Sequence, residues 1–215
     1  KPSTTYWKDS WRRFKKNKAA LSFLILLGVY LFFGLFGSFL SKYNYYEQHT
    51  QEIFLSPIKG FSKGYYLGTD SLGRDIYSRV IQGIKISLQL SIIVASICVI
   101  IGSIYGSISA YFGGIIDTIM VRIIEIVLSI PSMIYIILLM VVLGNSIKTI
   151  IIALALTRWL GYALLVRGEV LKIKENEYVL ASHALGANFW WIIKKHLLPN
   201  TLSIIIVRLT MDIPS

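Results

Sequence analysis

Long stretches without a charged residue constrain this chain more than any other feature of its sequence. One runs from Ile86 to Ile116 and another from Ala19 to Leu40. About 20 apolar residues in a helix cross about 30 Å of hydrocarbon, so each stretch is long enough to span a bilayer. Composition agrees, because only 15% of the residues are charged, against about a quarter in soluble domains. We predict an all-α membrane protein with several spanning helices.

The basic N-terminus predicts how the first helix is oriented. Residues 1–18 carry a cluster of lysines and arginines and a single acid, Asp9. Such clusters stay on the cytoplasmic side of a membrane. We therefore predict a cytoplasmic basic N-terminal segment at 1–18, a first transmembrane helix at 19–40 and an external loop at 41–85. A cleaved signal peptide is the alternative, but this apolar run is longer than the apolar part of a signal.

The net charge of +11 raises the question of nucleic-acid binding. The basic residues gather in a few tracts outside the apolar stretches, which is the distribution typical of topology signals. We expect no nucleic-acid partner, and we expect the lipid bilayer to be the main surroundings of the chain.

Residues 86–215 are predicted to form the core of the helix bundle. The second helix covers Ile86–Ile116, with Gly102 and Gly106 as candidate bends. The third apolar segment starts near Asp117, where Arg122 and Glu125 are spaced to pair on one helix face. Pro131 lies inside this third segment, where it removes a backbone hydrogen bond and is expected to kink the helix.

The fourth segment, roughly Ile147 to Val166, contains Arg158 near its middle. An arginine at that depth is costly unless it faces protein or water, so Arg158 is a candidate for the translocation path; snorkelling beside Trp159 is the structural alternative. A fifth segment begins at Thr201 and stops at the last residue, Ser215. Because the chain also starts without methionine, we expect it to be incomplete at both ends.

The polar and basic stretch at 167–200 is long for a connection between neighbouring helices, and such loops often carry function. Good helix formers run from Glu177 to Leu185, Gly186 is a plausible C-cap, and a second helical segment starts near Asn188 and stops at Pro199. We predict a helix, a glycine turn and a helix on the cytoplasmic side. Small side chains here let another protein approach the backbone closely: Ala181, Ser182, Ala184, Gly186 and Ala187.

The external loop holds two turns built from glycine and aspartate. They comprise Gly68, Asp70, Gly73, Arg74 and Asp75. The acids are too few and wrongly spaced for an EF-hand calcium loop. We expect turn chemistry with pairing of Arg74 and Asp75, and contact with a substrate-delivery protein is a further hypothesis.

The predicted cytoplasmic loop resembles a known family. Ala181, Gly186, Leu198 and Pro199 match the spacing of the EAA motif, written E-A-A-x3-G-x9-I-x-L-P, of the permease subunits of binding-protein-dependent ABC importers. The sequence departs from the motif at Leu180, Ser182 and His196.

Other segments resemble the oligopeptide, dipeptide and nickel branch of that family. The hairpin matches it at Glu177-Tyr178-Val179 and at His196-Leu197-Leu198-Pro199-Asn200. Further matches are Leu67-Gly68-Thr69-Asp70 with Leu72-Gly73-Arg74-Asp75, Tyr111 to Gly114, Asp117, Arg122 and Pro131, and Trp159, Tyr162, Arg167 and Glu169. The chain most resembles the C-type permease subunit of such systems.

The resemblance implies a type I ABC importer permease fold of six helices, of which about five are represented here, with the fifth cut short. It implies that the loop at 167–200 couples to ATPase subunits through Glu177, Tyr178, Ala181, Ser182, Ala184, Leu185, Gly186, Ala187, His196, Leu198 and Pro199. The implied partners are a second homologous permease, two ATPase subunits, an extracytoplasmic solute-binding protein and a peptide substrate. The implied location is the bacterial cytoplasmic membrane.

The sequence contains no G-x4-G-K-[ST] phosphate loop. We therefore expect a transporter subunit rather than an enzyme, with no cofactor or metal bound by this chain, and with ATP and Mg on the partner ATPases. Two alternatives stay open: an ion-coupled secondary transporter, which would place several ionisable residues at mid-membrane, and an ABC permease for nickel or another small solute.

Overall fold

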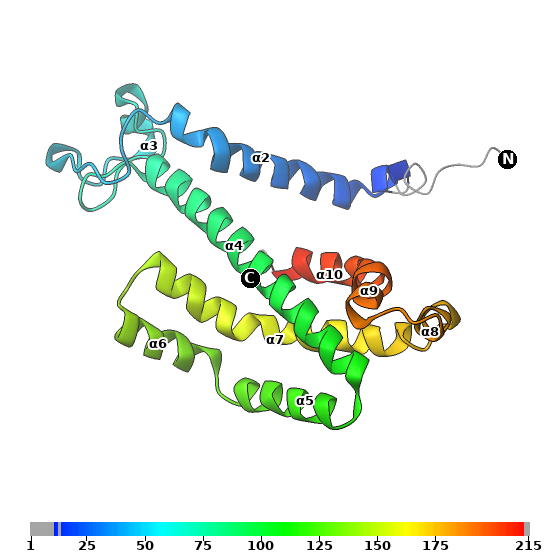
Figure 1. The fold of residues 1–215 in the computed structure, drawn as a ribbon. Helices are drawn as coiled ribbons and strands as arrows, with labels where there is room; N and C mark the ends of the chain where they lie inside the picture. The colour runs from blue at the N-terminus through cyan, green and yellow to red at the C-terminus, as the bar shows by residue number, and fades with distance from the viewer. Residues whose placement is uncertain (1–10, 13, 213–215) are drawn as a thin grey trace. The chain divides into compact units, whose positions relative to one another are not determined.

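A computed structural model describes residues 11–12 and 14–212, and Figure 1 shows the helices. Within these residues the only β-type pairing is an isolated bridge between Thr69 and Asp75, which confirms the all-α prediction. The predicted segment 1–18 is described only in part, because residues 1–10 and 13 lie outside the described residues. The chain divides into two compact units, Lys1–Gln89 and Leu90–Ser215, and each is described by itself.

The first unit begins with helix α2, Lys18–Leu40, as the apolar run predicts. The side chain of Asn17 caps it by accepting a hydrogen bond from the backbone N–H of Ala20 at 3.1 Å. Apolar side chains are exposed all around this helix, for example Phe23 and Leu35. A helix that is apolar on every side needs lipid or other protein around it.

Close packing joins α2 to the start of α4, Ile76–Phe112, within the first unit. A Cβ placed on Gly34 would lie 2.5 Å from Leu88, and one on Gly37 would lie 2.7 Å from Ile81. The two glycines therefore let the helices approach at a distance that any larger side chain would prevent.

The loop between α2 and α4 contains three short helices: η1 at Thr50–Glu52, α3 at Pro57–Gly60 and η2 at Phe61–Lys63. The loop is shorter than its predicted bounds of 41–85, because α4 already begins at Ile76. Asp75 starts this helix by accepting the backbone N–H of Ser78 at 3.1 Å, as an N-cap does.

The second unit contains the rest of α4, then α5 at Gly114–Leu128 and α6 at Ser132–Leu143. Helices α5 and α6 are bent by 76° at the break around Pro131. The predicted kink is thus a full interruption, since Pro131 adopts an extended ψ of 130° and stands before the first residue of α6.

Helix α7, Ile147–Ile173, packs tightly against α4. A Cβ on Gly102 would lie 2.5 Å from the Tyr162 side chain, and one on Gly106 would overlap the backbone of Ala163. Helix α4 runs unbroken through both glycines, and a bend at either of them stays a prediction. The two glycines serve to bring two helix backbones together.

The predicted helix, glycine turn and helix follow α7. They are α8 at Glu177–Ala184, the turn at Gly186, and α9 at Phe189–Ile192 with Asn188 as its cap. The chain then continues as a π-helical turn, η3 at Ile193–Leu197, and α10 at Leu198–Asp212.

The prediction that Pro199 stops this helical segment is wrong. It is the second residue of α10, and the wider π-helical turn η3 lies directly before it. A proline inside a helix lacks one N–H donor and crowds the carbonyl four residues earlier, and a local π turn relieves both effects. The helix therefore passes through Pro199.

Three of the described helices are long and apolar enough to cross a membrane: α2, α4 and α7. The bent pair α5 and α6 brings the number to four if it counts as one span. The prediction of a multi-pass helical membrane protein is confirmed.

Candidate functional site

The turn between α8 and α9 closes a hairpin, residues 177–197, which we call the coupling hairpin after the role that the sequence predicts for it. Gly186 adopts φ +83°, a conformation that is costly for residues with a Cβ. The backbone N–H of Leu185 donates to Ala181 at 3.0 Å, and that of Ala187 donates to Ser182 at 3.1 Å. These bonds satisfy the end of α8 and reverse the chain within a few residues.

A buried valine anchors the hairpin. Val179 on α8 is 4% exposed and belongs to one apolar cluster with residues of five other helical segments. The other buried members of the cluster are Ala110, Val166, Val170, Ile173, Ile192, Ile193, Leu197 and Ile205. The hairpin is therefore packed onto the ends of α4 and α7, and its position is tied to theirs.

His196 joins the two arms of the hairpin. Its Nε2 lies 3.0 Å from the hydroxyl of Ser182 on α8. Its ring also lies 5.3 Å from the ring of Tyr178 and 5.1 Å from that of Trp191. The sequence predicted Tyr178, Ser182 and His196 as site residues, and the structure brings them together; Val179 and Trp191 were not predicted.

The outward face of α8 is apolar and exposed. Leu180 is 56% exposed and Leu185 is 88% exposed, and Ala181 and Ala184 between them are also exposed. A hollow of about 330 Å³ beside this face is lined by Tyr111, Lys174, Glu175, Val179, Leu180, His183 and Ile192. Exposed leucines between small residues are typical of a surface that another protein covers.

Beneath the hairpin, Arg167 on α7 forms a bidentate ion pair with Asp117 on α5. The Nε of Arg167 donates at 2.6 Å, and a second guanidinium nitrogen donates to the other carboxylate oxygen. Ser109 on α4 donates to the same carboxylate, and Lys174 donates to the carbonyl of Ala110 at 2.8 Å. Three helices are thus held together by polar contacts at the same end as the hairpin. The sequence did not predict this pair.

The predicted pair of Arg122 with Glu125 is present on α5, with 2.7 Å between Nη1 and Oε2, and both side chains are exposed. Helix α5 therefore shares a partly buried pair with α7 and carries an exposed pair of its own.

Arg158 on α7 is exposed in the second unit, and its neighbour Trp159 is half-buried. Arg158 lines a hollow of about 50 Å³ together with Cys98, Tyr162, Asp212 and residues of α4. The ring of Trp159 packs edge-on against Tyr105 at 4.8 Å. Trp159 thus packs on α4, while Arg158 is exposed beside the hollow, and a role of Arg158 in translocation stays a prediction.

The glycine and aspartate turns of the first unit are centred on Asp70. Its carboxylate accepts the backbone N–H groups of Leu72 at 2.8 Å and Arg74 at 3.0 Å, and the Arg74 Nε at 2.8 Å. Burial by itself raises the pKa of Asp70, but these hydrogen bonds and the Arg74 charge outweigh it and hold that pKa below its ordinary value. The expected pairing of Arg74 with Asp75 is wrong, because Asp75 caps α4 and Arg74 pairs with Asp70 instead.

Gly68 and Gly73 have φ +78° and +71°. A Cβ on Gly68 would overlap the carbonyl of Leu55, and one on Gly73 would overlap that of His49. The turns therefore pack directly on the segment that follows α2.

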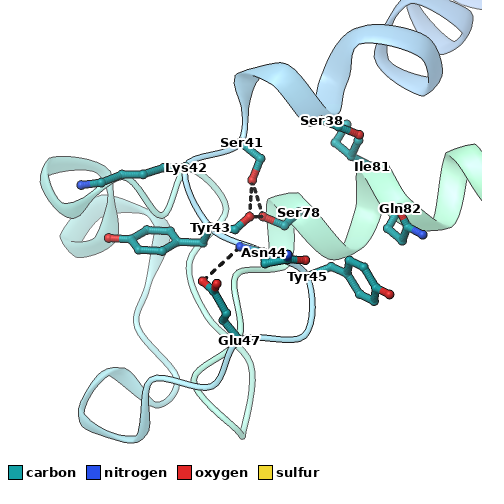
Figure 2. A pocket seen from close by; sticks show the side chains of 10 residues that line it. All are labelled: Ser38, Ser41, Lys42, Tyr43, Asn44, Tyr45, Glu47, Ser78, Ile81 and Gln82. Atoms are coloured by element: carbon teal, nitrogen blue, oxygen red, sulfur yellow. Dashed lines mark hydrogen bonds between the residues drawn. The ribbon is translucent and has the colours of Figure 1, made fainter.

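A polar hollow of about 430 Å³ lies next to these turns in the first unit (Figure 2). Ser78 at the start of α4 donates to the carbonyl of Tyr43 at 2.8 Å, and Ser41 after α2 donates to the same carbonyl at 2.7 Å. The backbone N–H of Asn44 donates to Glu47 at 3.2 Å. These bonds fix the two helix ends that frame the hollow.

The fold and the site define a multi-pass helical membrane protein with an exposed hairpin packed on its helix ends. Comparison with protein families places it more narrowly. Residues 102–215 match the family described as binding-protein-dependent transport system inner membrane component. Residues 5–57 match the N-terminal transmembrane domain of oligopeptide transport permease C. The chain belongs to the binding-protein-dependent transport family, and it is a multi-pass inner membrane protein.

Curated relatives agree over the whole chain. The dipeptide transport system permease protein DppC of Bacillus subtilis (strain 168) is 45% identical over 215 residues, covering 100% of this chain and 66% of the relative. The oligopeptide transport system permease protein OppC of the same organism is 41% identical, covering 100% and 69%. DppC of Lactococcus lactis subsp. cremoris (strain MG1363) is 37% identical, covering 100% and 72%. The chain spans about two thirds of the length of these relatives.

Proposed function

We propose that this chain is one of two membrane-spanning subunits of an ATP-driven importer of oligopeptides or dipeptides. The coupling hairpin receives the movement of a partner ATPase that carries ATP and Mg, and the helices packed beneath it reorient between two states. The N-terminus and the hairpin lie in the cytoplasm, and the glycine and aspartate turns lie outside, where an extracytoplasmic binding protein delivers the peptide.

The observation that carries this proposal is the combination of exposure and anchoring in α8. Leu180 and Leu185 point away from the chain's own core, while Val179 on the same helix is buried in it. A force applied to the exposed face therefore acts directly on the cluster that includes α7 and α10. A solvated linker would need neither the buried anchor nor the exposed leucines.

The cargo is inferred from the relatives. The dipeptide and oligopeptide permeases among them are similar over the full length of this chain. This supports a peptide rather than nickel, which the sequence alone left open. An ion-coupled secondary transporter is disfavoured, because the matched family works with separate binding proteins.

Gly186 offers a sharp test, because a Cβ at this position would meet nothing within 4 Å in this chain. Gly144, in the turn before α7, is a control with φ +82° and the same open space, and its ψ of 166° lies in a region that is essentially restricted to glycine. Replacing either glycine by leucine costs about 1–3 kcal/mol of backbone strain. Only Gly186→Leu should also collide with a docked ATPase.

We expect Gly186→Leu to abolish peptide uptake and peptide-stimulated ATP hydrolysis by the assembled transporter in proteoliposomes, with normal membrane insertion. Gly144→Leu should retain both activities. Equal retention of activity in the two variants would refute the coupling role, and so would hairpin cysteines that crosslink to no ATPase subunit.

A further inference from the structure

One face of the second arm of the coupling hairpin is not explained by contact with an ATPase through α8. Trp190, Trp191, Lys194 and Lys195 are all exposed, and they recur at the spacing of one helical turn along α9 and η3. The opposite face of the same segment, Ile192, Ile193 and Leu197, is buried in the apolar cluster. The segment is a short amphipathic helix whose outward side carries two indoles followed by two ammonium groups. We call this outward side the Trp–Lys face.

The position of this face along the fold is that of a membrane boundary. The buried side packs on Val170 and Ile173 at the end of α7, a helix long and apolar enough to span the bilayer. The next residue after η3 begins α10, whose Leu202, Ile206 and Val207 are exposed apolar side chains. Tryptophan is enriched where hydrocarbon meets headgroups, because its ring is apolar and its N–H is polar.

Charge identifies the lipid class. No aspartate or glutamate occurs between Glu177 and Asp212 in the sequence, so the two lysines meet no acid on their own segment. An anionic headgroup supplies the missing charge, and each lysine near such a surface contributes about 1 kcal/mol.

We propose that the Trp–Lys face binds anionic phospholipid headgroups of the cytoplasmic leaflet, and that this contact sets the position of the coupling hairpin. The link is direct: Trp191 packs edge-on against His196 at 5.1 Å, and His196 bonds to Ser182 of α8 at 3.0 Å. Lipid on one arm of the hairpin thereby steadies the arm that receives the ATPase. This consequence for coupling rests on the proposed function; the binding of lipid does not.

The test uses the assembled transporter in nanodiscs that contain brominated phosphatidylglycerol or brominated phosphatidylcholine. The fluorescence of Trp190 and Trp191 is obtained by subtracting the signal of the Trp190→Phe/Trp191→Phe variant from that of the parent protein. We expect stronger quenching by phosphatidylglycerol than by phosphatidylcholine. Lys194→Gln/Lys195→Gln should weaken the preference for phosphatidylglycerol roughly 30-fold, at about fivefold for each lysine.

Lys15→Gln/Lys16→Gln is the matched control, because these neighbouring lysines are also exposed and the charge removed is the same. An equal loss of preference in both double variants would mean general attraction to the bilayer and would overturn the proposal. So would equal quenching by the two lipids, or quenching that requires removal of the ATPase, which would show that protein covers the face.

ATP hydrolysis is then measured against the phosphatidylglycerol fraction. Peptide-stimulated ATP hydrolysis should rise with that fraction in the parent protein. In the Lys194→Gln/Lys195→Gln variant it should not change with that fraction. A lipid preference without any response of coupling would refute only the link through His196. Because quenching needs no transport, failure of the proposed function would leave the lipid result intact.

Discussion

The ion pair between Asp117 and Arg167 gives the most quantitative prediction of the structure. The side chain of Asp117 is 15% exposed and that of Arg167 is 28% exposed. The guanidinium makes two hydrogen bonds to the carboxylate, and Ser109 adds a third. Hydrogen bonds to charged groups contribute about 1.5–3 kcal/mol each before solvent screening. For this partly buried pair we expect a coupling energy of about 2 kcal/mol.

The perturbation is a double-mutant cycle with Asp117→Asn, Arg167→Gln and the combined variant. Each single change should lower the free energy of unfolding by about 2–3 kcal/mol, because it leaves the other charge partly buried without its partner. The combined variant should lose little more than either single variant. Unfolding is followed by titrating the purified protein from mild detergent micelles into dodecyl sulfate.

The same helix supplies the control. Arg122 and Glu125 form a pair of the same charge type, but their side chains are 72% and 52% exposed. An exposed pair of this spacing couples by only about 0.3–0.5 kcal/mol. If both cycles gave the same coupling, or if the Asp117–Arg167 coupling fell below about 0.5 kcal/mol, the argument from burial and bidentate geometry would be refuted.

Three further predictions concern single contacts. Gly106→Ala should destabilise the protein by about 1–3 kcal/mol in thermal unfolding, because its Cβ would overlap α7. Gly83→Ala, where the added Cβ meets open space, should be neutral or slightly stabilising. Equal effects of the two changes would contradict the close packing of α4 on α7. Asp70→Asn should raise hydrogen exchange in its turn about tenfold near neutral pH. Since the folded-state pKa of Asp70 is depressed, the difference should begin to shrink as pH falls below the ordinary 3.8 and should be lost only as pH falls through the depressed pKa; a difference that does not shrink at all below 3.8 would argue against a role of the charge. Ser182→Ala removes the bond to His196 and should speed exchange in the first arm of the hairpin about fivefold, and unchanged rates would show that the bond does not hold the two arms together.

The spanning segments and the hairpin could be predicted because both depend on local sequence. Apolar runs of sufficient length have few alternatives to a spanning helix. Gly186 alone predicts a left-handed turn, because that conformation is strained for a residue with a Cβ. Asn188 is a good cap for the helix that follows, and its side chain does accept the N–H of Trp191 at 2.8 Å.

The contacts that the sequence did not predict have two causes: at the start of α4 a different nearby partner is used, and at Gly102 and Gly106 the partner lies on a distant helix. The start of α4 at Ile76 depends on Asp75 acting as a cap, and this excludes its pairing with Arg74. The roles of Gly102 and Gly106 depend on α7, which is distant in sequence. Local patterns contain no information on the contact with α7, so the two glycines were interpreted as bends; for Arg74 the pattern offered two nearby acids, and the adjacent one was chosen.

The two kinds of helix break in the second unit suggest which parts move together. At Pro131 the chain is bent by 76°, and α6, which packs on α7, has no buried residue of its own. At Pro199 the helix instead continues through η3 into α10, and its buried residues lie in the same cluster as those of α7 and α8. A push on the coupling hairpin should therefore move α7 and α10 as one body, because separating them would expose Ile192, Ile193 and Leu197 to solvent. Burying side chains of this size contributes about 1.5–3 kcal/mol each, which is enough to make the packed arrangement behave as a rigid lever.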